Sequence, residues 1–113
     1  MSDARPRALL ALTTTASEAE ASSLARELLE SHLVACATML PGAKSMYWWQ
    51  GKIDEASECL VLLKTTSEQW PALKERLPAL HAYEVPELLA LDVADGLEPY
   101  LQWLITQAQG VPR

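Results

Sequence analysis

The feature that most constrains the fold is the order in which the hydrophobic spacing changes along the chain. A short apolar run over residues 7–14 ends in threonines and is typical of a strand that is buried on both faces. Ser17 and Glu20 then form a capping box in front of a stripe in which apolar residues recur every three or four positions. The stripe consists of Ala21, Leu24, Ala25, Leu28, Leu29 and Leu33. This part of the chain therefore predicts a strand followed by an amphipathic helix.

The remainder of the chain repeats these two patterns. Strand patterns cover residues 34–40, 46–50, 56–65 and 83–93, and helix patterns cover residues 66–77 and 97–108. We expect Pro41-Gly42 to stop the first of these strands and a polar turn over residues 51–55 to join the next two. Pro78 should help to end the second helix, and residues 95–98 offer a cap for the last one. Pro86 near the start of the final strand favours an edge position.

The resulting order is strand, helix, two strands, helix, strand and one extra helix. Two such βαβ halves predict an α/β (α+β) ferredoxin-like sandwich, in which helices cover one face of an antiparallel sheet. A chain of 113 residues fits one domain, so we expect a single domain over residues 1–113 with an ordered core at about 7–108.

Several predicted strands are apolar on both faces, although helices can cover only one face of this sheet. The run Met46–Trp49 places large apolar groups on both sides of a hairpin. Farther along, Leu60 and Leu62 point to one face while Val61 and Leu63 point to the other. A monomer would expose more contiguous apolar surface than soluble monomers tolerate. We therefore expect self-association through the open sheet face and the hairpin; the alternative is a hairpin that folds back on its own core.

Charge and motif spacing exclude several functions that occur on this fold. The net charge of −6 argues against nucleic acid or an anionic membrane as the main partner. Residues 59–63 contain no aromatic side chain for stacking on RNA bases, and residues 13–16 contain no CxxC metal motif. His32 falls within a helix pattern and His81 lies in a loop without a recognisable nucleophile motif. The sequence therefore predicts a binding protein and not an enzyme.

The cysteines and the hydropathy pattern indicate the compartment. Cys36 and Cys59 lie in apolar strand patterns without CxxC spacing, so we expect buried free thiols. The apolar run at residues 8–12 is too short for a secretory segment, and no stretch approaches the roughly 20 apolar residues of a membrane span. We expect a cytoplasmic protein without a membrane span.

Four motifs lie in register over the middle of the chain. They are Ala35-Cys36-Ala37-Thr38 with Pro41-Gly42, Ser45-Met46-Tyr47-Trp48-Trp49-Gln50-Gly51-Lys52, Lys64-Thr65, and His81-Ala82-Tyr83-Glu84-Val85-Pro86-Glu87. In order and spacing the chain closely resembles the CutA family from Ala8 to about Leu104. The resemblance implies a ferredoxin-like subunit, similar to the PII signalling proteins, that assembles as a homotrimer. It further implies a role in tolerance of divalent cations, copper binding in some members, no required cofactor and no enzymatic activity.

The chain departs from the family pattern at the expected copper ligands. Thr13 replaces a cysteine that some members have, Leu80 precedes the single His81 in place of a histidine pair, and Ala82 replaces a proline. His81 is thus the one candidate metal ligand that remains, and any metal binding should be weak.

A second candidate site is a cleft between subunits. Its candidate residues are Tyr47, Trp49, Glu58, Lys64, Tyr83 and Glu87. Tyr47 and Trp49 can instead serve as interface packing, and Glu58 and Lys64 should share one strand face. The alternatives to a metal-response protein are a PII-like trimer that binds a small molecule and a trimer that anchors or assembles other proteins.

Overall fold

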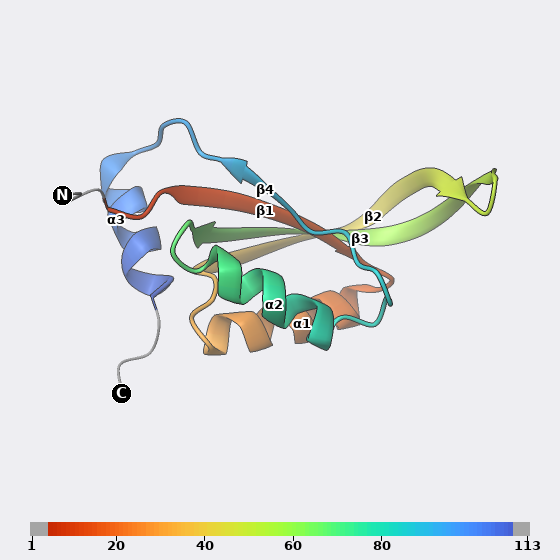
Figure 1. Cartoon of the computed structure of the whole chain (residues 1–113), viewed down its shortest axis with the longest axis horizontal. Coiled ribbons are helices and arrows are strands. Elements are labelled where there is room, and N and C mark those ends of the chain that lie inside the picture. The colour runs from red at the N-terminus through yellow and green to blue at the C-terminus, as the bar shows by residue number, and fades with distance from the viewer. Residues whose placement is uncertain (1–4, 110–113) are drawn as a thin grey trace.

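The computed structural model describes residues 5–109, which form four strands and three helices. In chain order these are β1 (Ala8–Thr15), α1 (Glu18–Glu30), β2 (Cys36–Trp49), β3 (Lys52–Thr66), α2 (Trp70–Leu80), β4 (Leu89–Asp92) and α3 (Glu98–Gln107) (Figure 1). None of these helices combines the length and apolar character needed to cross a membrane.

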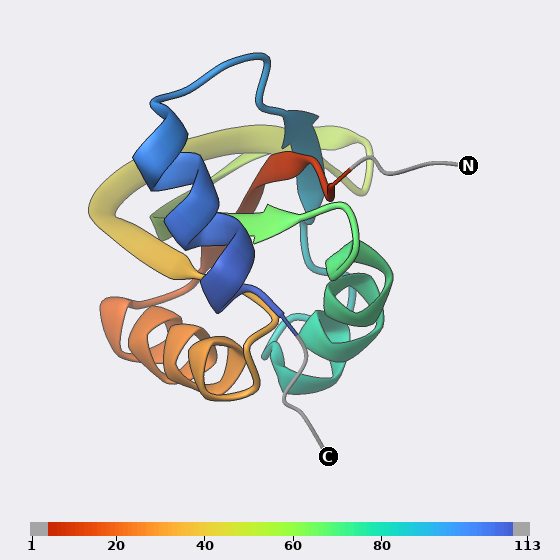
Figure 2. The same ribbon diagram turned by 90° about the vertical axis from the view of Figure 1, so that its left-hand side faces the viewer.

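The four strands form one antiparallel sheet in the order β2-β3-β1-β4. Helices α1 and α2 lie side by side against one face of the sheet, and α3 crosses one end of it (Figure 2). This arrangement confirms the ferredoxin-like α/β fold and the extra C-terminal helix predicted from the sequence.

The covered face of the sheet contains the main hydrophobic core. Val61 and Leu63 of β3 pack there with Leu28 of α1 and with Leu73 and Leu77 of α2, and all five side chains are buried. Burying a leucine or valine side chain stabilises a protein by about 1.5–3 kcal/mol, so this layer holds the helices on the sheet.

The opposite face, called the open face below, is also apolar. The strand register places seven leucines on it: Leu10, Leu12, Leu40, Leu60, Leu62, Leu89 and Leu91. Among residues 5–109, Leu104 and Ala108 of α3 cover one end of this face, at Ala8 and Ala35. Leu40, Leu89 and Leu91 are exposed, so residues 5–109 leave most of this leucine-rich face without a covering layer.

β2 and β3 are longer than predicted because Pro41-Gly42 does not stop the strand. The register shifts between Leu40 and Ala43, so one extra residue forms a β-bulge in which Gly42 adopts φ +83°. A bulge bends and twists a strand while pairing continues beyond it. The hairpin turns at Gln50 and Gly51, both with positive φ. Residues 43–58, the arm, extend past the helices (Figure 1).

Other element boundaries also differ from the prediction, and α2 begins at Trp70 and not at residue 66. β4 begins only at Leu89, because residues 83–88 form a loop, and the helix α1 ends at Glu30, before His32, which has φ 57°. Pro78 lies inside the last turn of α2 instead of ending it, since its fixed φ is compatible with a helix.

The predicted caps are confirmed in one case and wrong in the other. The Ser17 side chain accepts a hydrogen bond from the Glu20 backbone N–H at 3.1 Å, as expected at the start of α1. Asp95 caps no helix: its carboxylate accepts from Gly96 N–H, and Leu97 is the N-cap of α3 without a side-chain bond.

Candidate functional site

His81 lies at the C-cap of α2, where the α2–β4 loop passes the end of β1. Its Nε2 lies 2.7 Å from the carbonyl oxygen of Thr14, and its Nδ1 accepts a hydrogen bond from the backbone N–H of Tyr83 at 3.0 Å. One ring nitrogen must therefore donate while the other accepts, which assigns the neutral tautomer protonated on Nε2. Both nitrogens are used within the chain.

Tyr83 joins this loop to β3. Its hydroxyl donates to Oε2 of Glu58 at 2.6 Å, and its ring lies 4.9 Å from the His81 ring, centroid to centroid. Burial raises the pKa of the Tyr83 phenol well above its ordinary value, and the Glu58 carboxylate raises it further. The phenol is therefore a hydrogen-bond donor at neutral pH and fixes the Glu58 carboxylate at the bulged end of the open face.

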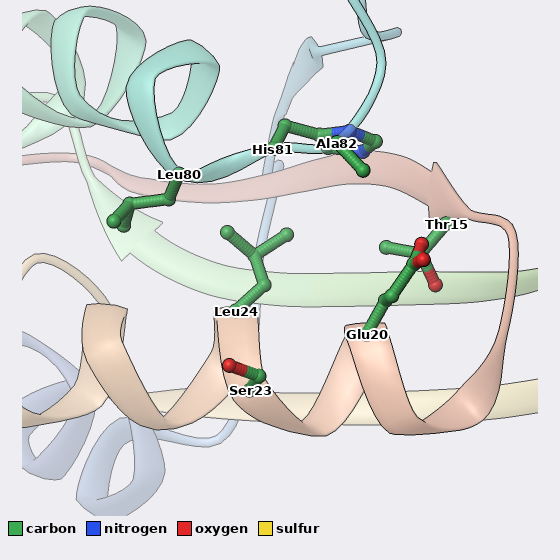
Figure 3. A pocket seen from close by; sticks show the side chains of 7 residues that line it. All are labelled: Thr15, Glu20, Ser23, Leu24, Leu80, His81 and Ala82. Atoms are coloured by element: carbon green, nitrogen blue, oxygen red, sulfur yellow. The ribbon is translucent and has the colours of Figure 1, made fainter.

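A hollow of about 100 Å³ lies between α1 and the start of this loop (Figure 3). It is lined by Thr15, Glu20, Ser23, Leu24, Leu80, His81 and Ala82. Ligand pockets usually measure about 300–1,000 Å³, so this hollow is too small for a metabolite. Glu20 was expected only as part of the helix cap, and no sequence pattern indicated that its carboxylate faces this hollow.

Lys64 is far along β3 from Glu58, although both lie on the open face as predicted. Its Nζ donates to Thr38 Oγ1 at 2.7 Å and to Cys36 Sγ at 3.5 Å. No carboxylate within residues 5–109 forms an ion pair with Lys64. The sequence did not predict that Thr38 and Cys36 of β2 bind Lys64, because only the strand register places Cys36 opposite Lys64.

The remaining predicted cleft residues are only partly brought together. Tyr47 is the smallest of the causes that raise the pKa of Tyr83, after burial, Glu58 and Glu20. Trp49 is exposed on the arm, and Glu87 is exposed in the α2–β4 loop without a hydrogen bond or ion pair to the rest of the described chain. One chain thus joins Glu58 and Tyr83 by a hydrogen bond but leaves the cleft incomplete.

The two thiols are unpaired, as predicted, but they differ in burial. Cys59 is buried on the helix-covered face, and this burial raises the pKa of its thiol. Cys36 is only half-buried, because it lies on the open face, so its predicted burial is wrong for a single chain.

The donor set does not fit a closed metal site in one chain. Within residues 5–109, no three His, Cys, Asp or Glu side chains come together in a way that could hold a metal ion. Thr13, at the position of the family cysteine, is fully buried, and its hydroxyl has no hydrogen-bond partner in the part of the chain described. A hydroxyl is also a poorer ligand than a thiolate for soft metals such as copper.

Comparison with known proteins identifies the family. The family model described as CutA1 divalent ion tolerance protein matches residues 9–107. A divalent-cation tolerance protein CutA from Thermus thermophilus is 48% identical over 93 residues, which cover 82% of this chain and 90% of that protein. Its counterpart from Citrobacter koseri is 46% identical over 99 residues, covering 88% of this chain and 86% of the relative.

Solved structures agree with this assignment. The crystal structure of CutA from Xylella fastidiosa superimposes with a TM-score of 0.88 at 40% identity, over 91% of this chain and 99% of that one. The chain therefore belongs to the CutA1 family of divalent ion tolerance proteins.

Proposed function

We propose that this protein takes part in the response to divalent cations as a cytoplasmic homotrimer that acts by binding and not by catalysis. The observation that carries the proposal is the near full-length match to proteins named divalent-cation tolerance protein. The fold supports it, because the match includes the strands and the arm that would build an assembly.

The open face supports the homotrimer. Its leucines form an apolar sheet surface that helices α1 and α2 cannot reach, since they lie on the other side of the sheet (Figure 2). Contiguous apolar surfaces of this kind usually mark interaction sites. Copies of the same chain would cover this surface and would also bury Cys36.

The His81 network supports binding over catalysis. A general base needs a free lone pair within reach of a substrate. Here the Nδ1 lone pair of His81 is used by Tyr83 N–H, and the Glu58 carboxylate accepts from the Tyr83 phenol. These bonds hold the loop against the sheet and engage both ring nitrogens of His81 within the chain.

Metal binding centred on His81 is proposed to be weak. A metal ion could take Nδ1 only if Tyr83 N–H lost its acceptor, and a buried donor without a partner costs about 1–3 kcal/mol. Within residues 5–109, too few other His, Cys, Asp or Glu side chains lie near His81 to complete a tight and selective copper site. The link to divalent cations would then rest on ligands that neighbouring copies add, or on an indirect response.

A small-molecule site between copies is the second candidate. Glu58 and Tyr83 are hydrogen-bonded at the bulged end of the open face, and the strand register places Tyr47 farther along the same side of the sheet. Lys64 supplies an ammonium group without a carboxylate partner in residues 5–109. Polar groups beside an apolar surface are typical of ligand clefts. A trimer that anchors other proteins would instead leave an apolar patch exposed after assembly.

Isothermal titration calorimetry with copper tests the metal proposal. The native chain should bind weakly, and His81→Ala should remove that binding, whereas His32→Ala should not change it, because the His32 Nδ1 contacts the Gln107 carbonyl away from this site. Unchanged binding in His81→Ala would exclude His81 as the ligand. Nanomolar binding in the native chain would mean that assembly completes a strong site.

A further inference from the structure

Cys36 and Lys64 bring a thiol into contact with an amine on the open face. The two residues are register partners on β2 and β3. Nζ of Lys64 lies 3.5 Å from Sγ of Cys36, and both side chains are half-buried. Within residues 5–109, no other lysine is hydrogen-bonded to a cysteine. The pair therefore has a chemistry that a lone cysteine lacks.

The two strands hold these groups together. The backbone N–H of Ala35 donates to the Lys64 carbonyl at 2.8 Å, so the strands are bonded directly beside the pair. Thr38 lies two residues from Cys36 on β2, and its Oγ1 accepts from Lys64 Nζ at 2.7 Å. In the described part of the chain, no carboxylate pairs with this ammonium group and draws it away from the sulfur. The lysine stem is flexible, so a small movement brings Nζ to bonding distance of Sγ.

The second thiol lacks such a neighbour. Cys59 is buried on the covered face, and its Sγ lies 4.0 Å from the Leu60 carbonyl oxygen. No lysine within residues 5–109 is hydrogen-bonded to it. Cys59 is therefore an internal control for any reaction that needs both a thiol and an amine.

We propose that Lys64 captures oxidised Cys36 in a covalent S–N bond that links β2 to β3. The oxidant is hydrogen peroxide, which removes two electrons from the sulfur. The Cys36 thiolate attacks one peroxide oxygen and the O–O bond breaks. The leaving hydroxide takes up the proton that the thiol released and becomes water. The product is a sulfenic acid within reach of Lys64 Nζ.

Sulfenic acids condense with nitrogen to form sulfenamides. The Lys64 ammonium first releases a proton to solvent, and the free amine then attacks the Cys36 sulfur. The S–N bond forms as the S–O bond breaks, and the departing hydroxide takes the second proton of the nitrogen and leaves as water. In total, one thiol, one amine and one peroxide molecule give one sulfenamide and two water molecules.

The link changes the open face in two ways. It removes the positive charge of Lys64, and it protects Cys36 from further oxidation to a sulfinic acid, which thiol reductants do not reverse. A thiol reductant restores both side chains, because its thiolate attacks the sulfur and displaces the amine. Assembly over the open face would slow the entry of peroxide but would not separate the two groups, so this inference does not rest on the proposed homotrimer.

Peptide mass spectrometry tests the link. The native full chain is treated with hydrogen peroxide, remaining thiols are alkylated after unfolding, and the protein is digested. The proposal expects the Cys36 and Lys64 peptides to be joined, with a mass lower than their sum by two hydrogen atoms, and dithiothreitol should release them. Cys59 should be recovered as an alkylated thiol at least about tenfold more often than Cys36, because it is buried.

Two lysine variants provide a matched comparison. Lys64→Arg keeps the positive charge but has no amine that attacks sulfur, so oxidised Cys36 should remain a sulfenic acid and react with dimedone, which traps that group. Dimedone labelling of the native chain should be lower by at least about tenfold. Lys44→Arg lies on the same strand, where Lys44 pairs with Glu55 at 3.5 Å, and should behave like the native chain.

The proposal fails if dimedone labels Cys36 equally in the native chain and in Lys64→Arg, because Lys64 then captures no oxidised sulfur. It also fails if Cys36 is recovered as an unmodified thiol after a treatment that converts the exposed Met46 to its sulfoxide. A joined peptide pair that retains one oxygen atom would overturn the S–N bond and indicate an S–O–N bridge instead.

Discussion

The two faces of strand β3 are both apolar but have different surroundings. Val61 and Leu63 are buried under α1 and α2, whereas Leu60 and Leu62 lie on the open face and stay partly exposed. The sequence supplies apolar residues to both faces, yet α1 and α2 cover one face whereas α3 covers only one end of the other. The difference indicates that one face stabilises the subunit and the other is available to stabilise an assembly.

Truncating a leucine on the covered face should have the largest effect on the subunit. Leu63→Ala leaves a cavity under two helices and should lower the free energy of unfolding by about 2–5 kcal/mol. Leu62→Ala should lower it by much less in the monomer, because that side chain is already in contact with water. Urea unfolding at several protein concentrations separates the two effects. Equal losses in dilute monomer would show that the faces do not differ as described.

The two thiols report the same contrast by their reaction rates. In a monomeric variant, Cys36 should react with a thiol reagent about a hundredfold faster than Cys59, because thiolate formation and access both govern reactivity. Cys59 is buried, and burial raises the pKa of its thiol, so its thiolate is scarce. In the assembled protein Cys36 should become slow as well. Mass spectrometry of timed samples measures both rates, and rapid labelling of native Cys59 would contradict its placement.

Removing the Tyr83 hydroxyl tests the contact between the loop and the open face. Tyr83→Phe should destabilise the subunit by about 1–3 kcal/mol, since it removes a hydrogen bond to a charged group. The pKa of Tyr83 is raised in the folded state, so the folded protein binds this proton more tightly than the unfolded chain does. The stabilisation that results is fully present below the ordinary pKa of 10 and is lost as the pH rises through the folded-state pKa. Above pH 10, the unfolding temperature should therefore fall less steeply with pH in Tyr83→Phe than in the wild type. If wild type and Tyr83→Phe lose stability with the same slope, Tyr83 is not the cause of the pH dependence.

The smallest expected effect concerns a buried hydroxyl on the covered face. Thr13→Val keeps the shape of the side chain and removes a hydroxyl that has no partner in the described residues, so it should stabilise the subunit by about 1 kcal/mol. A loss of stability would mean that a water or another group satisfies this hydroxyl. Thr65→Val is the matched control and should destabilise, because the Thr65 hydroxyl donates to the Leu33 carbonyl at 2.6 Å.

Periodicity predicted the fold well because strands and helices bury different faces at different spacings. The alternation in residues 59–63 and the stripe over residues 21–33 placed the covered core correctly except at Leu29, which is exposed. The bulge was not predictable, since Pro41-Gly42 is compatible with either a strand end or a β-bulge, and only pairing with β3 decides between them. The short β4 was missed for a similar reason, because residues 83–88 have strand-like composition but pair with no strand.

The candidate site was harder to predict from the sequence than the fold. The position of Tyr83 beside Glu58 depends on a loop crossing between segments 25 residues apart. The hydrogen bond from His81 is made to the backbone carbonyl of Thr14, and a backbone acceptor cannot be predicted from residue types. Motif resemblance identified the participating residues but not which of them meet in one chain.

The central claim is that copies of this chain cover the open face, and multi-angle light scattering tests it most directly. The native protein should elute at three times the 12.4 kDa chain mass. Leu62→Lys should elute at one chain mass with an unchanged far-ultraviolet circular dichroism spectrum, because a charge on the open face opposes association but leaves the covered core intact. A native protein that elutes as a stable monomer would contradict the claim.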